Sequence, residues 1–137
     1  MPNPSVHEAL IYLMVVTSAS DRDMTDPELG RIGEVVQSWP VFADFDVHSL
    51  VATAQDCQRL LHEPAGLDGV LALAQAVIPP RLHDTAYAAA VEVAAVDLEM
   101  RIEEARVLDR LRAVLAVTDE VADGIDYSAK ARHRMLT

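Results

Sequence analysis

Two short acidic segments carry the residue types with which this chain could bind a metal ion. Each follows an apolar stretch and reads acid-x-acid-Met, with a Glu seven residues after the first acid. The carboxylates are Asp21, Asp23 and Glu28 in the first segment and Asp97, Glu99 and Glu104 in the second. Equivalent residues are 76 positions apart, since both 97 − 21 and 104 − 28 equal 76. This constant spacing predicts an internal repeat whose two acidic turns share one site.

Carboxylate oxygens are the ligands that hard divalent cations such as Ca²⁺, Mg²⁺ and Mn²⁺ prefer. A turn that holds two acids two residues apart, with a Glu beyond them, can direct several oxygens at one point. We therefore predict that the six carboxylates bind a divalent cation, and we expect no organic cofactor. The first segment is not an EF-hand, because Asp26 and Ile32 occupy the loop positions that require Gly and Glu.

The first segment also has an explanation that needs no metal. Thr25 and Glu28 have the spacing of a capping box, in which each side chain accepts a hydrogen bond from the other residue's backbone N–H at the start of a helix. The second segment lacks this explanation, because Arg101 stands at the position equivalent to Thr25. Glu104 therefore lies either in solvent on a charged helix or in a metal site.

The motifs of the common enzyme classes are absent from the sequence. The chain has no GxSxG, no glycine-rich phosphate loop, no HExxH and no CxxC, and its five histidines keep no metal-ligand spacing. We therefore expect a protein without enzymatic activity. Metal-dependent hydrolysis by the same carboxylates is a weaker alternative, which turnover of phosphoesters that disappears in EDTA would support.

Composition limits the fold class and the partners. With 137 residues, half of them apolar and only 4% aromatic, the chain fits one domain over residues 1–137, and its abundance of Ala, Val and Leu favours packed helices. The net charge of −11 excludes nucleic acid as a partner and favours divalent cations or a basic protein surface. The single cysteine, Cys57, lies in an apolar pattern and is predicted to be a buried thiol.

Localisation is predicted from what the sequence lacks. The first ten residues contain no basic region ahead of an apolar run, and no apolar stretch has the length of a membrane span. We therefore expect a cytoplasmic protein without direct membrane insertion. A protein partner is expected, and homo-oligomerisation stays open.

Apolar periodicity and helix-capping residues predict six or seven helices and no strand. The expected helices are 5–19, which should be amphipathic, 26–38, one from Asp46 to before Pro64 with Val51 on its apolar face, 67–78, 82–98 and 102–117. The connection from Trp39 to Phe42 should pack on the core. In the last segment, 119–137, Asp123-Gly124 is a turn signal and a basic tail either frays or folds back on acidic surface. The two repeat units, about 6–38 and 82–117, are expected to pack as a pseudo-twofold pair in one compact all-α domain.

The motifs around the two acidic turns resemble those of the tellurite-resistance protein TerB and its relatives. The resemblance rests on ASDRDM with Glu28 and AVDLEM with Glu104, and it spans about 6–117. Arg22 and Leu98 replace the Gly that often follows the first acid, which leaves each turn less freedom to adopt positive φ.

The resemblance implies an all-helical domain of about seven helices and a divalent-metal site at the six carboxylates. It also implies a non-enzymatic role in tellurite resistance or stress response beside partner proteins. An alternative from a different class is a metal-free interaction module, which would bind a partner through its acidic surface and the segment from Trp39 to Phe42.

Overall fold

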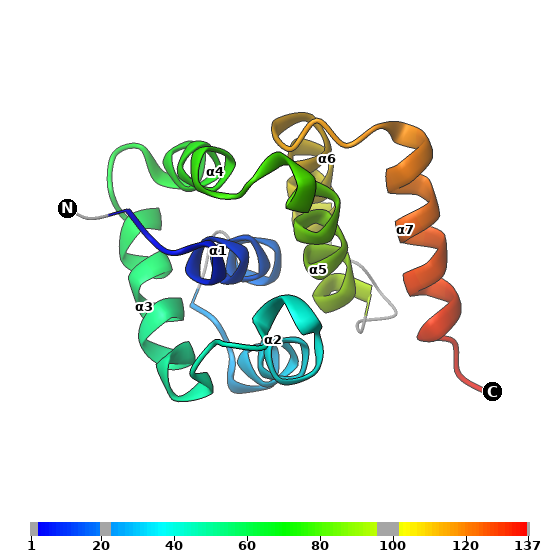
Figure 1. Ribbon diagram of the computed structural model, residues 1–137, viewed down its shortest axis with the longest axis horizontal. Coiled ribbons are helices and arrows are strands. Elements are labelled where there is room, and N and C mark those ends of the chain that lie inside the picture. The colour runs from blue at the N-terminus through cyan, green and yellow to red at the C-terminus, as the bar shows by residue number, and fades with distance from the viewer. Residues whose placement is uncertain (1–2, 20–22, 96–101, 137) are drawn as a thin grey trace.

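The computed structural model describes residues 3–19, 23–95 and 102–136 and shows one compact all-α domain (Figure 1). Within these ranges there are seven α-helices and no strand. The helices are α1 (Val6–Ala19), α2 (Asp26–Ser38), α3 (Leu50–Leu61), α4 (Gly66–Val77), α5 (His83–Ala95), α6 (Ile102–Val114) and α7 (Asp119–Arg132). Three single-turn 3-10 helices join them, namely η1 (Pro40–Phe42), η2 (Val47–Ser49) and η3 (Pro80–Leu82). No helix within these ranges is long and apolar enough to cross a membrane.

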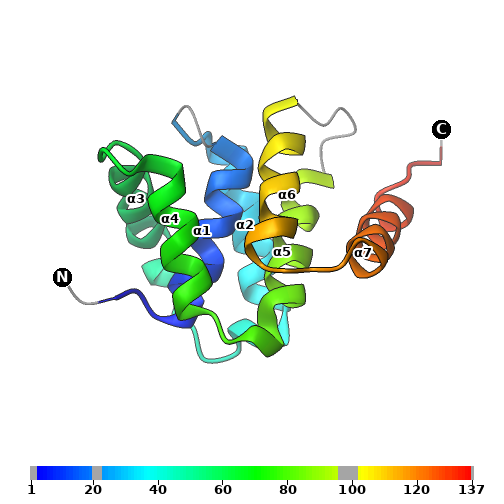
Figure 2. The same ribbon diagram turned by 90° about the horizontal axis from the view of Figure 1, so that it is seen from above.

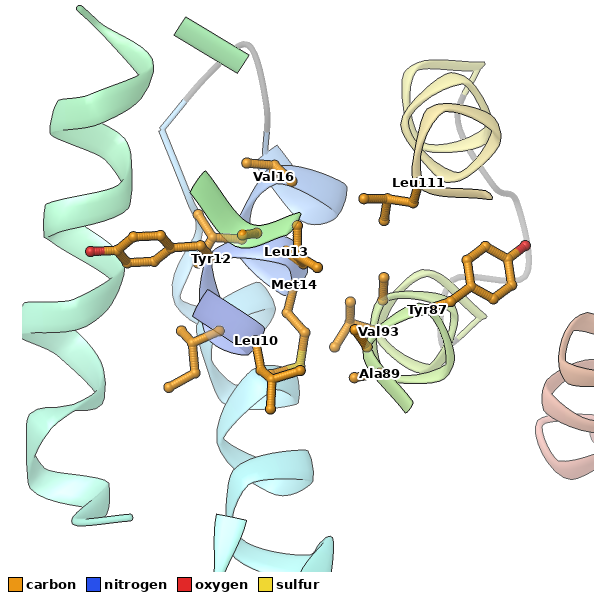
Figure 3. Packing of buried hydrophobic residues seen from close by; sticks show 14 of the residues in the cluster. Leu10, Tyr12, Leu13, Met14, Val16, Tyr87, Ala89, Val93 and Leu111 are labelled. Carbon is orange, nitrogen blue, oxygen red and sulfur yellow. The ribbon is translucent and has the colours of Figure 1, made fainter. Parts of the chain in front are cut away.

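Helix α1 is the centre of the domain, with α2, α3, α4, α5 and α6 packed around it (Figures 1 and 2). Every residue from Ala9 to Thr17 is buried, so no side of this stretch faces water. In Figure 3, Tyr12 points toward α3 while Leu10 and Met14 lie on the side of α5. The amphipathic pattern predicted for 5–19 was therefore wrong in character, although the helix itself was placed correctly.

Helix α2 begins and ends where the sequence predicts. Thr25 and Glu28 form the predicted capping box, with the Thr25 backbone N donating to Glu28 Oε1 at 2.9 Å and the Glu28 N donating to Thr25 Oγ1 at 3.3 Å. After α2, the Trp39-Pro40 step starts η1 and places Phe42 in the core at 2% exposure. The prediction of a packed connection is confirmed.

The third predicted helix is divided in two. Asp46 caps η2 by accepting from the His48 N at 3.0 Å, and α3 follows from Leu50. Val51 was predicted to face inward, but it is 51% exposed, because the inward positions of α3 are taken by Thr53 and Ala54.

Helix α5 is buried on two sides because it lies between α1 and α7. Its small side chains allow both neighbours to approach closely. Helix α7 packs mainly on α5 and continues through Asp123 and Gly124. The turn predicted there was wrong, since docking on α5 and an ion pair from Asp123 outweigh the cost of one glycine within a helix.

Candidate functional site

Three of the six predicted metal ligands lie among the described residues. Asp23 precedes α2 and is exposed, whereas Glu28 in α2 and Glu104 in α6 are buried. The remaining three, Asp21, Asp97 and Glu99, lie outside the described residues.

Glu28 and Glu104 occupy equivalent places in the fold. Each is the third residue of its helix, and each is almost fully buried, at 6% and 4% exposure. Within the described ranges the other buried polar side chains are Thr17 and Thr53, so these two glutamates are the only buried acids there. Because a carboxylate loses its hydration on burial, both positions need a compensating interaction.

The helix ends that flank the acidic segments point to the same side of the domain. Figure 2 shows the C-terminal end of α1 and the N-terminal ends of α2 and α6 on that side. Helix α1 packs against both α2 and α6. Glu28 and Glu104 therefore belong to two helices that both pack on α1.

Part of the compensation for Glu28 comes from its capping box. Glu28 Oε1 accepts hydrogen bonds from the Thr25 backbone N and from Thr25 Oγ1, at 2.9 and 3.0 Å. The structural explanation of Glu28 is thereby confirmed. It does not extend to Glu104, because the residue equivalent to Thr25 is Arg101, whose side chain has no hydrogen-bond acceptor.

The described carboxylates alone do not make a metal site. In residues 3–19, 23–95 and 102–136 no group of three or more His, Cys, Asp or Glu side chains is arranged to hold a metal ion. The donor type nevertheless fits a hard cation, since the predicted set consists of carboxylates alone. A complete site therefore needs ligands from Asp21, Asp97 or Glu99.

His83 and Cys57 have structural partners away from these segments. The two ring nitrogens of His83 contact the carbonyl oxygens of Leu115 and Ile78, at 3.1 and 2.8 Å, and so join the ends of α6 and α4 to the start of α5. Cys57 is fully buried, as predicted, and burial raises the pKa of its thiol to about 12. A thiol with this pKa stays protonated near neutral pH and is a poor metal ligand.

An arginine-centred polar network joins α7 to α5 and α6, and the sequence analysis missed it. Tyr87 Oη donates to Asp126 Oδ1 at 2.8 Å and accepts from Arg112 Nε at 3.1 Å. The Arg112 guanidinium also pairs with Asp126 at 2.6 Å, Asp123 at 3.0 Å and Asp119 at 3.4 Å. The spacing of these three aspartates, which places them along one helix face, was the signal available in the sequence.

This network has consequences for protonation. Burial raises the pKa of Tyr87 to about 12, and the hydrogen bond to Tyr87 is the largest cause of the raised pKa of Arg112. Tyr87 therefore stays a neutral hydrogen-bond donor near neutral pH. The network holds α5, α6 and α7 together through hydrogen bonds and ion pairs.

A second ion-pair cluster holds the C-terminal end of α7. Glu92 in α5 binds Arg132, and its Oε1 lies 2.8 Å from His133 Nε2. A groove of about 210 Å³ lies between Trp39 and the Glu92–Arg132 pair, and Ala88, Ile125 and Ser128 also line it. Packing between α7 and the rest of the domain is therefore incomplete along this seam.

Neither a family model, nor a curated protein, nor a solved structure matches this chain.

Proposed function

We propose that this chain is a TerB-like, non-enzymatic protein that binds a divalent cation between its two acidic segments. The observation that carries the proposal is the equivalent burial of Glu28 and Glu104, at the third residue of α2 and of α6. Sequence spacing selected both residues, and they are the only buried acids in the described ranges. Burial removes the hydration of both carboxylates, and a divalent cation is one partner that can replace it at two equivalent sites.

The arrangement of helices supports the internal repeat that the proposal requires. Helix α1 packs on α5. In addition, α1 contacts α6, which follows α5 in the chain, and α5 contacts α2, which follows α1. Reciprocal packing of this kind is expected when two helix pairs, α1 with α2 and α5 with α6, are related by a pseudo-twofold axis.

The proposed ligands are Asp21, Asp23, Glu28, Asp97, Glu99 and Glu104, and Ca²⁺, Mg²⁺ and Mn²⁺ are the ions that suit them. In this arrangement the buried glutamates form the inner side of the site and the exposed Asp23 lies at its mouth. The resemblance to TerB suggests a role in tellurite resistance or another stress response. Because the chain is strongly anionic, that role would not involve attraction of the tellurite anion by charge.

A thermal melt of EDTA-treated protein titrated with Ca²⁺, Mg²⁺ and Mn²⁺ tests the proposal. An ion that binds only the folded state adds about 2.7 kcal/mol of stability at a hundredfold excess over its dissociation constant. We expect the parent to show such a shift and the Asp21→Asn/Asp97→Asn double variant to lose it.

The matched control is Asp44→Asn/Asp109→Asn, which removes the same charge from two exposed positions elsewhere. The control should keep the shift of the parent. An equal shift in all three proteins would show that the cation binds elsewhere, and no shift with any ion would contradict the proposal.

A metal-free interaction module is the second candidate function, and one surface feature favours it. A groove of about 370 Å³ lies where α2 meets η1 and η2, lined by Trp39, Pro40, Phe45 and Val47 among others. Partly exposed aromatic side chains in a groove are typical of protein-binding surfaces. Under this alternative no ion stabilises the protein, and Trp39→Ser abolishes capture of a protein partner that the parent retains.

A further inference from the structure

The connection between α6 and α7 contains a strained residue. Ala116 has φ of +51°, the left-handed region, and it is the only non-glycine residue with positive φ in the described ranges. The Ala116 N donates to the Ala113 carbonyl at 3.2 Å and the Val117 N donates to the Arg112 carbonyl at 3.0 Å. This pair of bonds is a Schellman motif, in which glycine normally holds the position of Ala116. The alanine side chain therefore makes the sharp exit from α6 unfavourable.

No residue in the connection prevents a straighter path. Leu115, Ala116, Val117 and Thr118 include no Gly or Pro, and Ala is the best helix former. If Ala116 moved to the right-handed region, α6 could continue through these residues into α7 as one helix. The strain at Ala116 would be released, and α7 would leave its place on α5.

The attachment of α7 can be formed equally well by another copy of the chain. Helix α7 packs mainly on α5, through Ala122, Ile125 and Ala129. Its polar links run to side chains outside α7, with Asp126 bound to Tyr87 and Arg132 bound to Glu92. Figure 2 shows α7 at the edge of the domain, separated from α1 by α5. Removing α7 would thus leave the packing around α1 in place.

We propose that α7 exchanges between two copies of this chain, so that α7 of each copy packs on α5 of the other. The surface that receives α7 is the α5 face around Tyr87, Ala88 and Glu92, and its ligand is the identical helix of a second copy. Short strained hinges favour such exchange, because the swapped form keeps the native contacts and loses the strain at both hinges.

Substitutions at Ala116 test the role of the hinge. Glycine removes the strain at each of the two hinges in the monomers, so Ala116→Gly should raise the dimer dissociation constant about 30-fold or more. The β-branched Ala116→Val should lower that constant, because valine tolerates the left-handed region less well than alanine. The measurement is mass from light scattering after refolding over a range of protein concentrations. A parent that stays monomeric at every concentration, or equal dimerisation of all three proteins, would overturn the proposal.

A charge exchange between α5 and α7 tests whether the helices cross between copies. Glu92→Arg and Arg132→Glu each break the pair within one chain. In a swapped heterodimer of the two variants, Arg at 92 meets Glu at 132 at one junction and the native pair forms at the other. We therefore expect the mixed variants to form mainly heterodimers, identified by native mass spectrometry.

Circular dichroism of each variant should show the helix content of the parent, which separates loss of exchange from failure to fold. A random mixture of dimers would indicate side-by-side association, and it would overturn the exchange of α7.

Discussion

Helices α1 and α7 have the same length but are held in the domain by different forces. Ten of the 14 residues of α1 are buried, and they contact neighbours on all sides. In α7, which also has 14 residues, only Ala122 and Ala129 are buried. Helix α7 compensates with ion pairs along its length, to Arg112 in its first half and middle and to Glu92 near its end. The comparison indicates that apolar burial fixes the centre of this domain and that charge fixes its edge.

This difference should appear in stability and in dynamics. Burial of apolar surface is insensitive to salt, whereas ion pairs between partly exposed groups are screened and weak. Helix α7 is therefore expected to open locally at a lower free energy than α1.

The largest expected effect comes from truncating a side chain in α1. Leu13→Ala should lower the free energy of unfolding by about 2–5 kcal/mol, because Leu13 is fully buried and its neighbours cannot fill the cavity. Ile125→Ala in α7 is the matched control, and its half-buried side chain should cost about 1 kcal/mol. Urea denaturation measures both. Equal losses would contradict the contrast between the two helices.

Alkaline pH should lower the free energy of unfolding through one group beside α1 and one beside α7. The loss should begin near pH 9 for Cys57 and near pH 10 for Tyr87. The pKa of Cys57, which contacts the Tyr12 carbonyl in α1, rises from 9.0 to about 12, and that of Tyr87 rises from 10.0 to about 12. Each group ionises earlier in the unfolded chain than in the folded one, so its stabilisation is present at lower pH and is lost as pH rises.

The free energy of unfolding, measured by denaturation at a series of pH values, should therefore fall between pH 9 and 12. Cys57→Ala should remove the part of the slope that begins near pH 9, and Tyr87→Phe the part that begins near pH 10. Unchanged slopes in both variants would show that other groups control alkaline unfolding.

Arg112→Met should lower global stability less than Leu13→Ala but have a clear local effect on α7. The substitution removes the common partner of Tyr87, Asp123 and Asp126, and we expect a loss of about 1–2 kcal/mol. Hydrogen exchange of α7 amides should accelerate while that of α1 amides stays the same. Arg110→Met is the control, since its pair with Asp68 is largely exposed and should contribute less than about 0.5 kcal/mol. Equal acceleration in α1 and α7 would argue against a separately held α7.

Local signals in the sequence were sufficient where a helix end is fixed by adjacent residues. The capping box of Thr25 and Glu28 placed the start of α2, and the apolar periodicity with Trp39-Pro40 placed its end. Such ends depend on hydrogen bonds and sterics within a few residues, so they can be predicted without knowledge of the fold. The spacing of 76 residues likewise selected Glu28 and Glu104, whose shared burial the structure then showed.

Features that depend on distant partners could not be predicted in this way. Periodicity placed the helix at 5–19, but only the packing of five other helices determined that its middle is buried on every side. Asp123-Gly124 reads as a turn in isolation, yet Arg112, brought near by the exit from α6 at Ala116, helps to keep α7 continuous there. Signals within the sequence were enough to place most helices and to pair Glu28 with Glu104 by their spacing. Tertiary structure decided which helix is central and which is held by charge, because burial and ion pairing are properties of neighbours in space.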